Sequence, residues 1–260
     1  MPTLIVERDG PIATIRISNP AKYNAMTLSM WQALPLELQA LDADPEIRVI
    51  VLEGDGGKAF VSGADISELE RHGADALSQA RFNQSIEEAY LSPTRCSKPV
   101  VAKIRGICMG GGLGLAAACD MRICTSESRF RMPAARLGVG YTAIGVRRFM
   151  QVIGLQHTVD LFMSARIVNA AQALAMGFVA RVCEPDELDA VVNDWCQSVA
   201  ANAPLTLRAL KLTVNDWLRD PATHVSDEVE AAIQRCFDSE DYREGARAFM
   251  EKRPARFQGC

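Results

Sequence analysis

Two short runs of this chain, IRVIVLEG at residues 47–54 and KPVVAKIRG at residues 98–106, are mostly apolar and rich in Val and Ile. A run of this length without polar alternation is typical of a strand that is buried on both faces, as in parallel sheets. Patterns with helical spacing separate the two runs. Strands that alternate with helices in this way predict an α/β protein built on a parallel sheet.

The remaining sequence extends this alternation. LIVERDGPIATIRIS, residues 4–18, indicates two strands joined by a turn at Asp9, Gly10 and Pro11. Thr27 is placed to cap the helix that follows it. Further short strands are expected in DMRICTSESRFRM and GFVARVC, and helices at roughly 74–91, 112–119, 143–164 and 170–176.

The pattern changes after Cys183, where nearly every segment has helical spacing. We therefore expect a β/α core over residues 1–183 and a helical region over residues 184–260. No internal repeat and no low-complexity linker separates the two parts. A terminal helical region of this kind is expected to pack on a neighbouring subunit.

Composition excludes several classes of partner. The net charge is −4 over 260 residues, so the chain lacks the basic character of a nucleic-acid-binding protein. No apolar run is long enough to span a bilayer. The eight cysteines form no CxxC pair and the three histidines are scattered, so neither a disulfide framework nor a metal site is expected. With reduced thiols and no basic leader after Met1, a cytoplasmic location is expected.

Two glycine-containing loops follow predicted strands and precede predicted helices. One is CMGGGLGLA, residues 108–116, and the other is KAFVSGADI, residues 58–66, with Gly63 at the turn and Asp65 placed to cap the next helix. A helix N-terminus exposes unpaired N–H groups, and glycine lets the backbone approach a ligand closely. A dinucleotide-binding fingerprint does not fit, because no acidic residue ends a second strand about 20 positions on. Taken alone, the triple glycine also fits a tight turn packed against the core.

Together the two loops indicate a more specific arrangement. If the strands before them are parallel, both loops lie at one edge of a sheet, and each aims a backbone N–H group at the same point. Two such donors form an oxyanion hole, which stabilises negative charge developing on a carbonyl oxygen. Losing one donor of this kind costs on the order of 10²–10³ in rate.

Three segments, FVSGADI, KPVVAKIRGICMGGGLGLAAACD and DSEDYREGARAFMEKRPARF, together resemble the crotonase, or enoyl-CoA hydratase/isomerase, superfamily. The likeness runs from ISNPAKYNAM to Phe257, which is nearly the whole chain. It implies a ββα spiral core followed by a helical trimerisation region, assembled as a homotrimer or a dimer of trimers. It also implies an acyl-CoA substrate whose thioester enolate is held by two backbone amides, here those of Ala64 and Gly111.

The resemblance implies where CoA binds. The adenine edge would meet the backbone of three consecutive residues, Ala64, Asp65 and Ile66. Lys22 would lie near the phosphates, and Phe249 and Lys252 match the C-terminal residues that reach a CoA held by an adjacent subunit. No cofactor is expected beyond the CoA moiety of the substrate.

Two glutamates that hydratases of this family use are absent from this chain. The position three residues after the oxyanion glycine is Gly114, and the position after the proline of FRMPAARLG is Ala134. Hydration needs one group to activate water and one to deliver a proton, and neither glycine nor alanine does this. No Asp or Glu occurs over residues 130–150, while Glu68 and Glu70 also fit the solvated face of a helix.

Tyr141 points to a different reaction. LGVGYTAIG resembles the methylmalonyl-CoA decarboxylase branch, which also has a tyrosine at this position. Decarboxylation suits a site without a base, because loss of CO₂ itself generates the enolate, and a tyrosine or a bound water then reprotonates the carbon. The likeness is partial, since that branch has histidine at the position of Ala64 and glutamate at that of Gly114. Tyr141 is equally compatible with an aromatic ring that only fills the pocket wall.

The residues leave three functions open. Decarboxylation of a malonyl-type CoA is favoured, because it fits both the absent glutamates and Tyr141. Enoyl-CoA hydration through an unrecognised acid is the alternative within the family. A non-catalytic acyl-CoA-binding homologue is the third.

Overall fold

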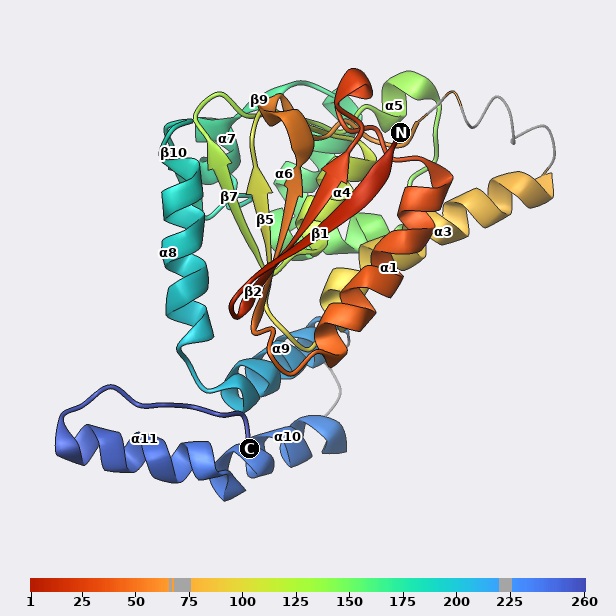
Figure 1. Ribbon diagram of the computed structural model, residues 1–260. Coiled ribbons are helices and arrows are strands. Elements are labelled where there is room, and N and C mark those ends of the chain that lie inside the picture. Colours follow the sequence, from red (N-terminus) through yellow and green to blue (C-terminus); the bar gives the residue numbers. More distant parts are fainter. Residues whose placement is uncertain (66, 68–75, 220–225) are drawn as a thin grey trace.

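The computed structural model describes residues 1–65, 67, 76–219 and 226–260. Its larger sheet has six strands in the order β1-β2-β3-β5-β7-β10 (Figure 1). Their bounds are β1 Thr3–Asp9, β2 Ile12–Ser18, β3 Val49–Gly54, β5 Val100–Ile104, β7 Met121–Thr125 and β10 Arg181–Cys183. The β1–β2 pair is antiparallel and every other pair is parallel. The predicted parallel sheet and the hairpin over residues 4–18 are both confirmed.

A second, four-stranded sheet has the order β4-β6-β8-β9, with bounds β4 Ala59–Val61, β6 Ile107–Met109, β8 Arg129–Arg131 and β9 Val168–Asn169. The chain gives one strand to each sheet in turn, as β3 leads to β4, β5 to β6 and β7 to β8. Helices follow each pair: α3 Ala76–Arg95, α4 Gly111–Ala118, and α5 Ala134–Leu137 with α6 Ala143–Ser164. This repeated ββα order winds the chain into a spiral and brings the carboxyl ends of β4, β6 and β8 to one edge.

Helix α1, Leu28–Ala43, begins where the sequence predicts, because the Thr27 hydroxyl accepts the backbone N–H of Met30 at 3.3 Å. Helices α1 and α3 lie side by side beyond one face of the larger sheet (Figure 1). The main core lies between the two sheets and these helices. Its largest fully buried side chains include Trp31, Phe60, Phe130 and Phe149.

The opposite face of the larger sheet is covered by α8, Leu188–Ala200 (Figure 1). Leu188, Val192 and Cys196 of this helix pack against Val49 and Val101 of the sheet. The first helix after residue 183 therefore completes the packing of the sheet. Before α8, the described residues also form the short α7, Ala170–Ala175, and two 3-10 turns, Pro20–Lys22 and Asp55–Gly57.

The last helices extend away from the sheets: α9 Pro204–Arg219, α10 Asp227–Asp238 and α11 Glu240–Glu251 (Figure 1). A buried lysine fixes α9 to the core. The Lys211 ammonium donates to the Asp120 carboxylate at 2.6 Å and to the carbonyl oxygens of Pro93 and Lys98 at 2.8 Å each. Lys211 thereby joins α9 to the end of α3 and to the loops beside β5 and β7.

The C-terminal tail folds back along α11. Asp241 accepts the backbone N–H groups of Gln258 and Gly259 at 2.6 and 2.8 Å, and Glu244 accepts that of Arg256 at 3.1 Å. In the described ranges, no helix has the length and apolar character needed to cross a membrane.

Candidate active site

The two glycine loops meet at the carboxyl edge of the smaller sheet. Strands β4 and β6 are parallel neighbours, so the loops that leave them start side by side. A Cβ atom added to Gly63 would lie 3.7 Å from the backbone nitrogen of Gly111, and one added to Gly110 would lie 3.8 Å from the Cα of Gly63. The structure thus brings together the two loops that the sequence singles out.

Each loop presents a backbone donor at this edge. Met26 pairs with the residues on either side of Ala64: its N–H donates to the Gly63 carbonyl, and its carbonyl accepts from Asp65 N–H, both at 2.9 Å. Gly111 is the first residue of α4, where an amide has no intrahelical partner. Among the residues that the structure describes, neither Ala64 N–H nor Gly111 N–H donates a hydrogen bond. Both are therefore available to an acceptor.

The glycines are required by the backbone path and by close packing. Gly110 has φ 53° and ψ −119°, a combination that side chains other than hydrogen disfavour strongly. A Cβ on Gly112 would overlap the carbonyl oxygen of Val61, so α4 approaches β4 without room for a methyl group. These two positions let α4 begin directly against the neighbouring loop, with the amide of Gly111 at its start.

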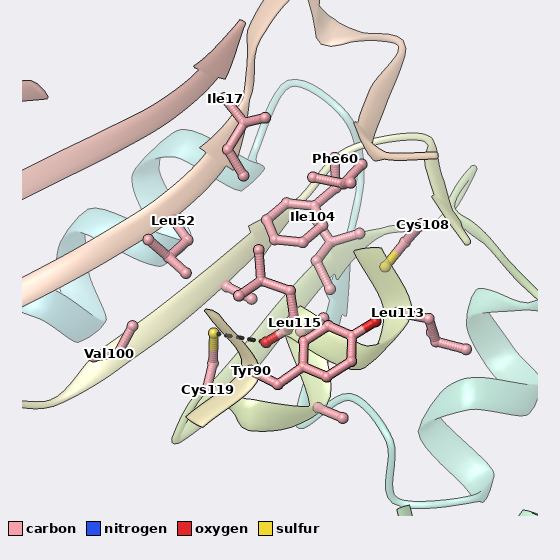
Figure 2. Close-up of a cluster of buried hydrophobic side chains, with 14 of the residues drawn as sticks. Ile17, Leu52, Phe60, Tyr90, Val100, Ile104, Cys108, Leu113, Leu115 and Cys119 are labelled. Carbon is pink, nitrogen blue, oxygen red and sulfur yellow. Dashed lines mark hydrogen bonds between the residues drawn. The ribbon is translucent and has the colours of Figure 1, made fainter. Parts of the chain in front are cut away.

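Two tyrosine hydroxyls occupy the space beside Gly114. A Cβ on Gly114 would overlap the Tyr141 hydroxyl and lie 2.9 Å from that of Tyr90. Figure 2 shows Tyr90 among the buried side chains of the core, next to Leu113 and Leu115 of α4. The volume that a side chain at position 114 would enter is therefore taken by two phenols.

The two phenols are joined and held by other rings. The Tyr141 hydroxyl donates to the Tyr90 hydroxyl at 3.3 Å, and the rings stack with centroids 6.3 Å apart. Trp31 meets the Tyr90 ring edge-on at 5.8 Å, and Phe162 meets the Tyr141 ring edge-on at 5.1 Å. Burial raises the pKa of Tyr90 to about 12 and that of Tyr141 well above its ordinary value. Both side chains remain neutral proton donors at neutral pH.

Sequence reasoning predicts Tyr141 and misses Tyr90. Tyr90 lies within the segment expected to be helical, at a position whose burial needs no functional explanation. Its partner is 51 residues away along the chain. No local pattern marks such a pair.

The Asp65 carboxylate, in the loop that follows β4, faces Lys22. The Lys22 ammonium donates to it at 2.7 Å, and Ser67 donates from both its backbone and its hydroxyl, at 3.1 and 2.7 Å. Partial burial acts to raise the pKa of Asp65, but these hydrogen bonds outweigh it and lower the pKa below its ordinary value. The Asp65 carboxylate is therefore ionised and paired, and the Lys22 side chain, half exposed, lies beside the loop.

Other predicted site residues lie elsewhere or outside the described part of the chain. Ile66, Glu68 and Glu70 are not among the described residues. Phe249 and Lys252 are exposed at the C-terminal end of α11, and Figure 1 separates that helix from the glycine loops of the same chain.

A cavity of about 510 Å³ adjoins the phenol pair. Residues of α3 and α4, among them Tyr90 and Gly114, line one side of it, and residues of α6, α9 and α10 line the other. Ala134, at the start of α5, is partly buried against the core. Among the described residues, no group of three or more His, Cys, Asp or Glu side chains is arranged to hold a metal ion.

Comparison with known proteins agrees with this arrangement. The family model described as enoyl-CoA hydratase/isomerase matches residues 7–260. The short-chain-enoyl-CoA hydratase of Clostridium acetobutylicum is 30% identical, with 96% of this chain and 95% of the relative covered. The methylmalonyl-CoA decarboxylase of Escherichia coli is 31% identical, with 95% of each chain covered.

A solved structure has nearly the same fold. The enoyl-CoA hydratase/carnithine racemase of Magnetospirillum magneticum superposes with a TM-score of 0.95 at 34% identity, covering 100% of this chain and 97% of the other. The two interleaved sheets and the terminal helices are therefore those of the crotonase fold, as the sequence predicts. The chain belongs to the enoyl-CoA hydratase/isomerase, or crotonase, family.

Proposed function

We propose that this protein decarboxylates a malonyl-type acyl-CoA, with the N–H groups of Ala64 and Gly111 forming the oxyanion hole. The observation that carries the proposal is the environment of Gly114. Two neutral phenols, and no side chain of residue 114 itself, face the space beside the free amide of Gly111. This arrangement can donate a proton but offers no carboxylate at position 114 to activate water.

The chemistry follows from these groups. The bond between Cα and the carboxylate breaks, CO₂ leaves, and the electron pair moves through Cα onto the thioester oxygen. Two backbone donors aimed at that oxygen stabilise the resulting enolate more than the starting thioester, which lowers the barrier. Cα then takes a proton from a weak acid, and the hydrogen-bonded pair of Tyr141 and Tyr90 supplies neutral hydroxyls in this part of the molecule.

The proposed CoA contacts are those that the family resemblance implies. The backbone of residues 64–66 is proposed to bind the adenine edge, and Lys22, half exposed beside Asp65, to approach the phosphates. The family resemblance assigns Phe249 and Lys252 to a CoA held by an adjacent subunit, so a homotrimer or a dimer of trimers is part of the proposal. No cofactor other than the CoA moiety is proposed.

Enoyl-CoA hydration is the second candidate, because several relatives carry that name. It requires a group that activates water. The segment with Glu68 and Glu70 lies outside the described residues, so these are the acids to test.

The deciding experiment is mass spectrometry of an acyl-CoA panel after incubation with the purified protein. The panel contains methylmalonyl-, ethylmalonyl- and crotonyl-CoA together with longer and aromatic enoyl-CoAs. Loss of CO₂ from a malonyl-type member, abolished in a Gly110→Ala variant that still folds, is the expected result. Gain of water on an enoyl member overturns the proposal in favour of hydration. No change in any member, with CoA thioesters still bound, supports a non-catalytic binding protein.

A further inference from the structure

The Tyr90 hydroxyl contacts the start of α4 as well as the Tyr141 hydroxyl. A Cβ on Gly111 would lie 3.3 Å from the Tyr90 oxygen, which is one of the three atoms nearest to it. The same oxygen would lie 2.9 Å from a Cβ on Gly114, one turn further along α4. The Tyr90 oxygen therefore lies beside the first turn of α4, where the free amide of Gly111 is located.

The hydrogen bond between the phenols has a direction that matters for proton transfer. The Tyr141 hydroxyl is the donor and the Tyr90 hydroxyl the acceptor, at 3.3 Å. The Tyr90 oxygen keeps its own proton, which is free to point elsewhere. Tyr90 is 7% exposed, and burial also raises the pKa of the Tyr141 hydroxyl well above its ordinary value. With Tyr141 as the donor, the Tyr90 proton is the one that can be passed onward to a substrate.

From these contacts we propose that Tyr90 is the catalytic residue that protonates Cα of the enolate, and that Tyr141 is a positioning residue that hands its proton to Tyr90. The assignment rests on the proposed decarboxylation and names its proton donor. In the step, the Tyr90 O–H bond breaks and a Cα–H bond forms. The Tyr141 proton moves to the Tyr90 oxygen, and water restores the proton on Tyr141. One proton is consumed overall, and no electron donor or acceptor is needed.

The contacts that hold the Tyr90 ring in place do not involve its hydroxyl group. Trp31 meets the ring edge-on at 5.8 Å, and Tyr141 stacks on it at 6.3 Å. Phenylalanine at position 90 keeps both ring contacts and removes the oxygen, which is also the acceptor of the Tyr141 hydroxyl. Tyr90→Phe is therefore expected to fold with a slightly lower unfolding temperature, and it separates a chemical role from a packing role.

The test is decarboxylation of methylmalonyl-CoA in D₂O, with analysis of the configuration of deuterium at Cα of the product. Wild-type protein is expected to place one deuterium in a single configuration. Tyr90→Phe is expected to form product at least about tenfold more slowly and to give both configurations, because solvent then protonates either face. Tyr141→Phe is expected to slow the reaction and keep one configuration. Tyr242→Phe, an exposed tyrosine of α11, is the matched control and is expected to behave as wild type.

A single configuration in the Tyr90→Phe product, at any rate, overturns the assignment. If wild-type protein releases no CO₂ from any malonyl-type CoA, the proposed function fails by itself, and Tyr90 is then tested on exchange of the α-hydrogen of propionyl-CoA in D₂O. Exchange in wild type that falls at least about tenfold in Tyr90→Phe supports the assignment. Equal exchange in both proteins, or none in the wild type, overturns it.

Discussion

Gly63 lies against Gly111: a Cβ on Gly63 would be in van der Waals contact with the Gly111 backbone nitrogen, at 3.7 Å. The two residues come from loops that follow different strands, β4 and β6, and only the parallel pairing of those strands brings them together. Gly63 also has φ +125°, which an L-amino acid rarely adopts. The position of the proposed donor at Ala64 therefore depends on a backbone conformation at the preceding residue that glycine adopts without strain.

Gly63→Ala is expected to lower the decarboxylation rate by a factor on the order of 10²–10³, because displacing one donor removes its contribution to the transition state. Backbone strain should lower the free energy of unfolding by about 1–3 kcal/mol. Steady-state kinetics and urea denaturation measure the two effects. Gly10→Ala is the control: Gly10 also has a positive φ of 53°, but no heavy atom lies within 4 Å of its added Cβ. A matching rate loss in Gly10→Ala would show that general destabilisation causes the effect.

Gly114→Ala should disturb the phenol pair directly. Its methyl group would overlap the Tyr141 hydroxyl, so the two tyrosines must move apart or the helix must shift. We expect a loss of about 1–3 kcal/mol in stability from overpacking, with at least tenfold lower decarboxylation. Gly140→Ala, where nothing lies within 4 Å of the added atom, should change neither quantity. A Gly114→Ala protein as stable and active as wild type would contradict the described position of the hydroxyls.

The pH dependence of stability should report the burial of Tyr90. Burial raises the pKa of Tyr90 to about 12, whereas a tyrosine in an unfolded chain titrates near about 10. The unfolded state loses its proton first, so this stabilisation is complete below a pH of about 10 and is lost as pH rises towards about 12.

Between about pH 9 and 11, the free energy of unfolding should therefore fall by about 1.4 kcal/mol more in wild type than in Tyr90→Phe. Buried cysteines such as Cys96 and Cys119, whose pKa values burial also raises to about 12, titrate in both proteins and cancel in the comparison. Urea denaturation at each pH gives the two curves. Parallel curves would show that the Tyr90 hydroxyl is not buried.

Lys211→Met should loosen the terminal helices. The Lys211 side chain is 8% exposed, and its ammonium group donates hydrogen bonds to one carboxylate and two carbonyl oxygens. Removing one partner of a buried ion pair costs about 3–5 kcal/mol, and the lower value is expected here because Asp120 is 32% exposed. Chemical denaturation measures the loss. Lys58→Met removes an exposed lysine and should stay within about 0.5 kcal/mol of wild type.

Local signals account for the parts of the fold that the sequence predicts well. The turn at Gly10, the cap at Thr27 and the helix over residues 143–164 each depend on neighbours in the chain, and all three are observed. The predicted boundary at residue 183 follows the onset of helical spacing. Periodicity cannot tell which surface a helix covers, and α8, just after that boundary, packs on the sheet.

The candidate site also contains residues that the sequence predicts and residues that it does not. The loops at Gly63 and Gly111 are visible in the sequence because a strand, a glycine and a helix start follow one another. Tyr90 is not visible, since a buried aromatic residue on a helix looks identical whether it fills the core or carries a proton. Only the three-dimensional path shows that its oxygen lies beside Gly111 and Gly114.

The proposed enolate-binding groups are main-chain amides, held in place by the start of α4 and by the pairing of Met26 with the loop around Ala64. Mutation cannot delete a peptide N–H except by introducing proline. Side chains beside the amides, by contrast, can be exchanged without removing either proposed donor. A laboratory selection for new thioester chemistry on this protein should therefore begin at positions 90, 114 and 141.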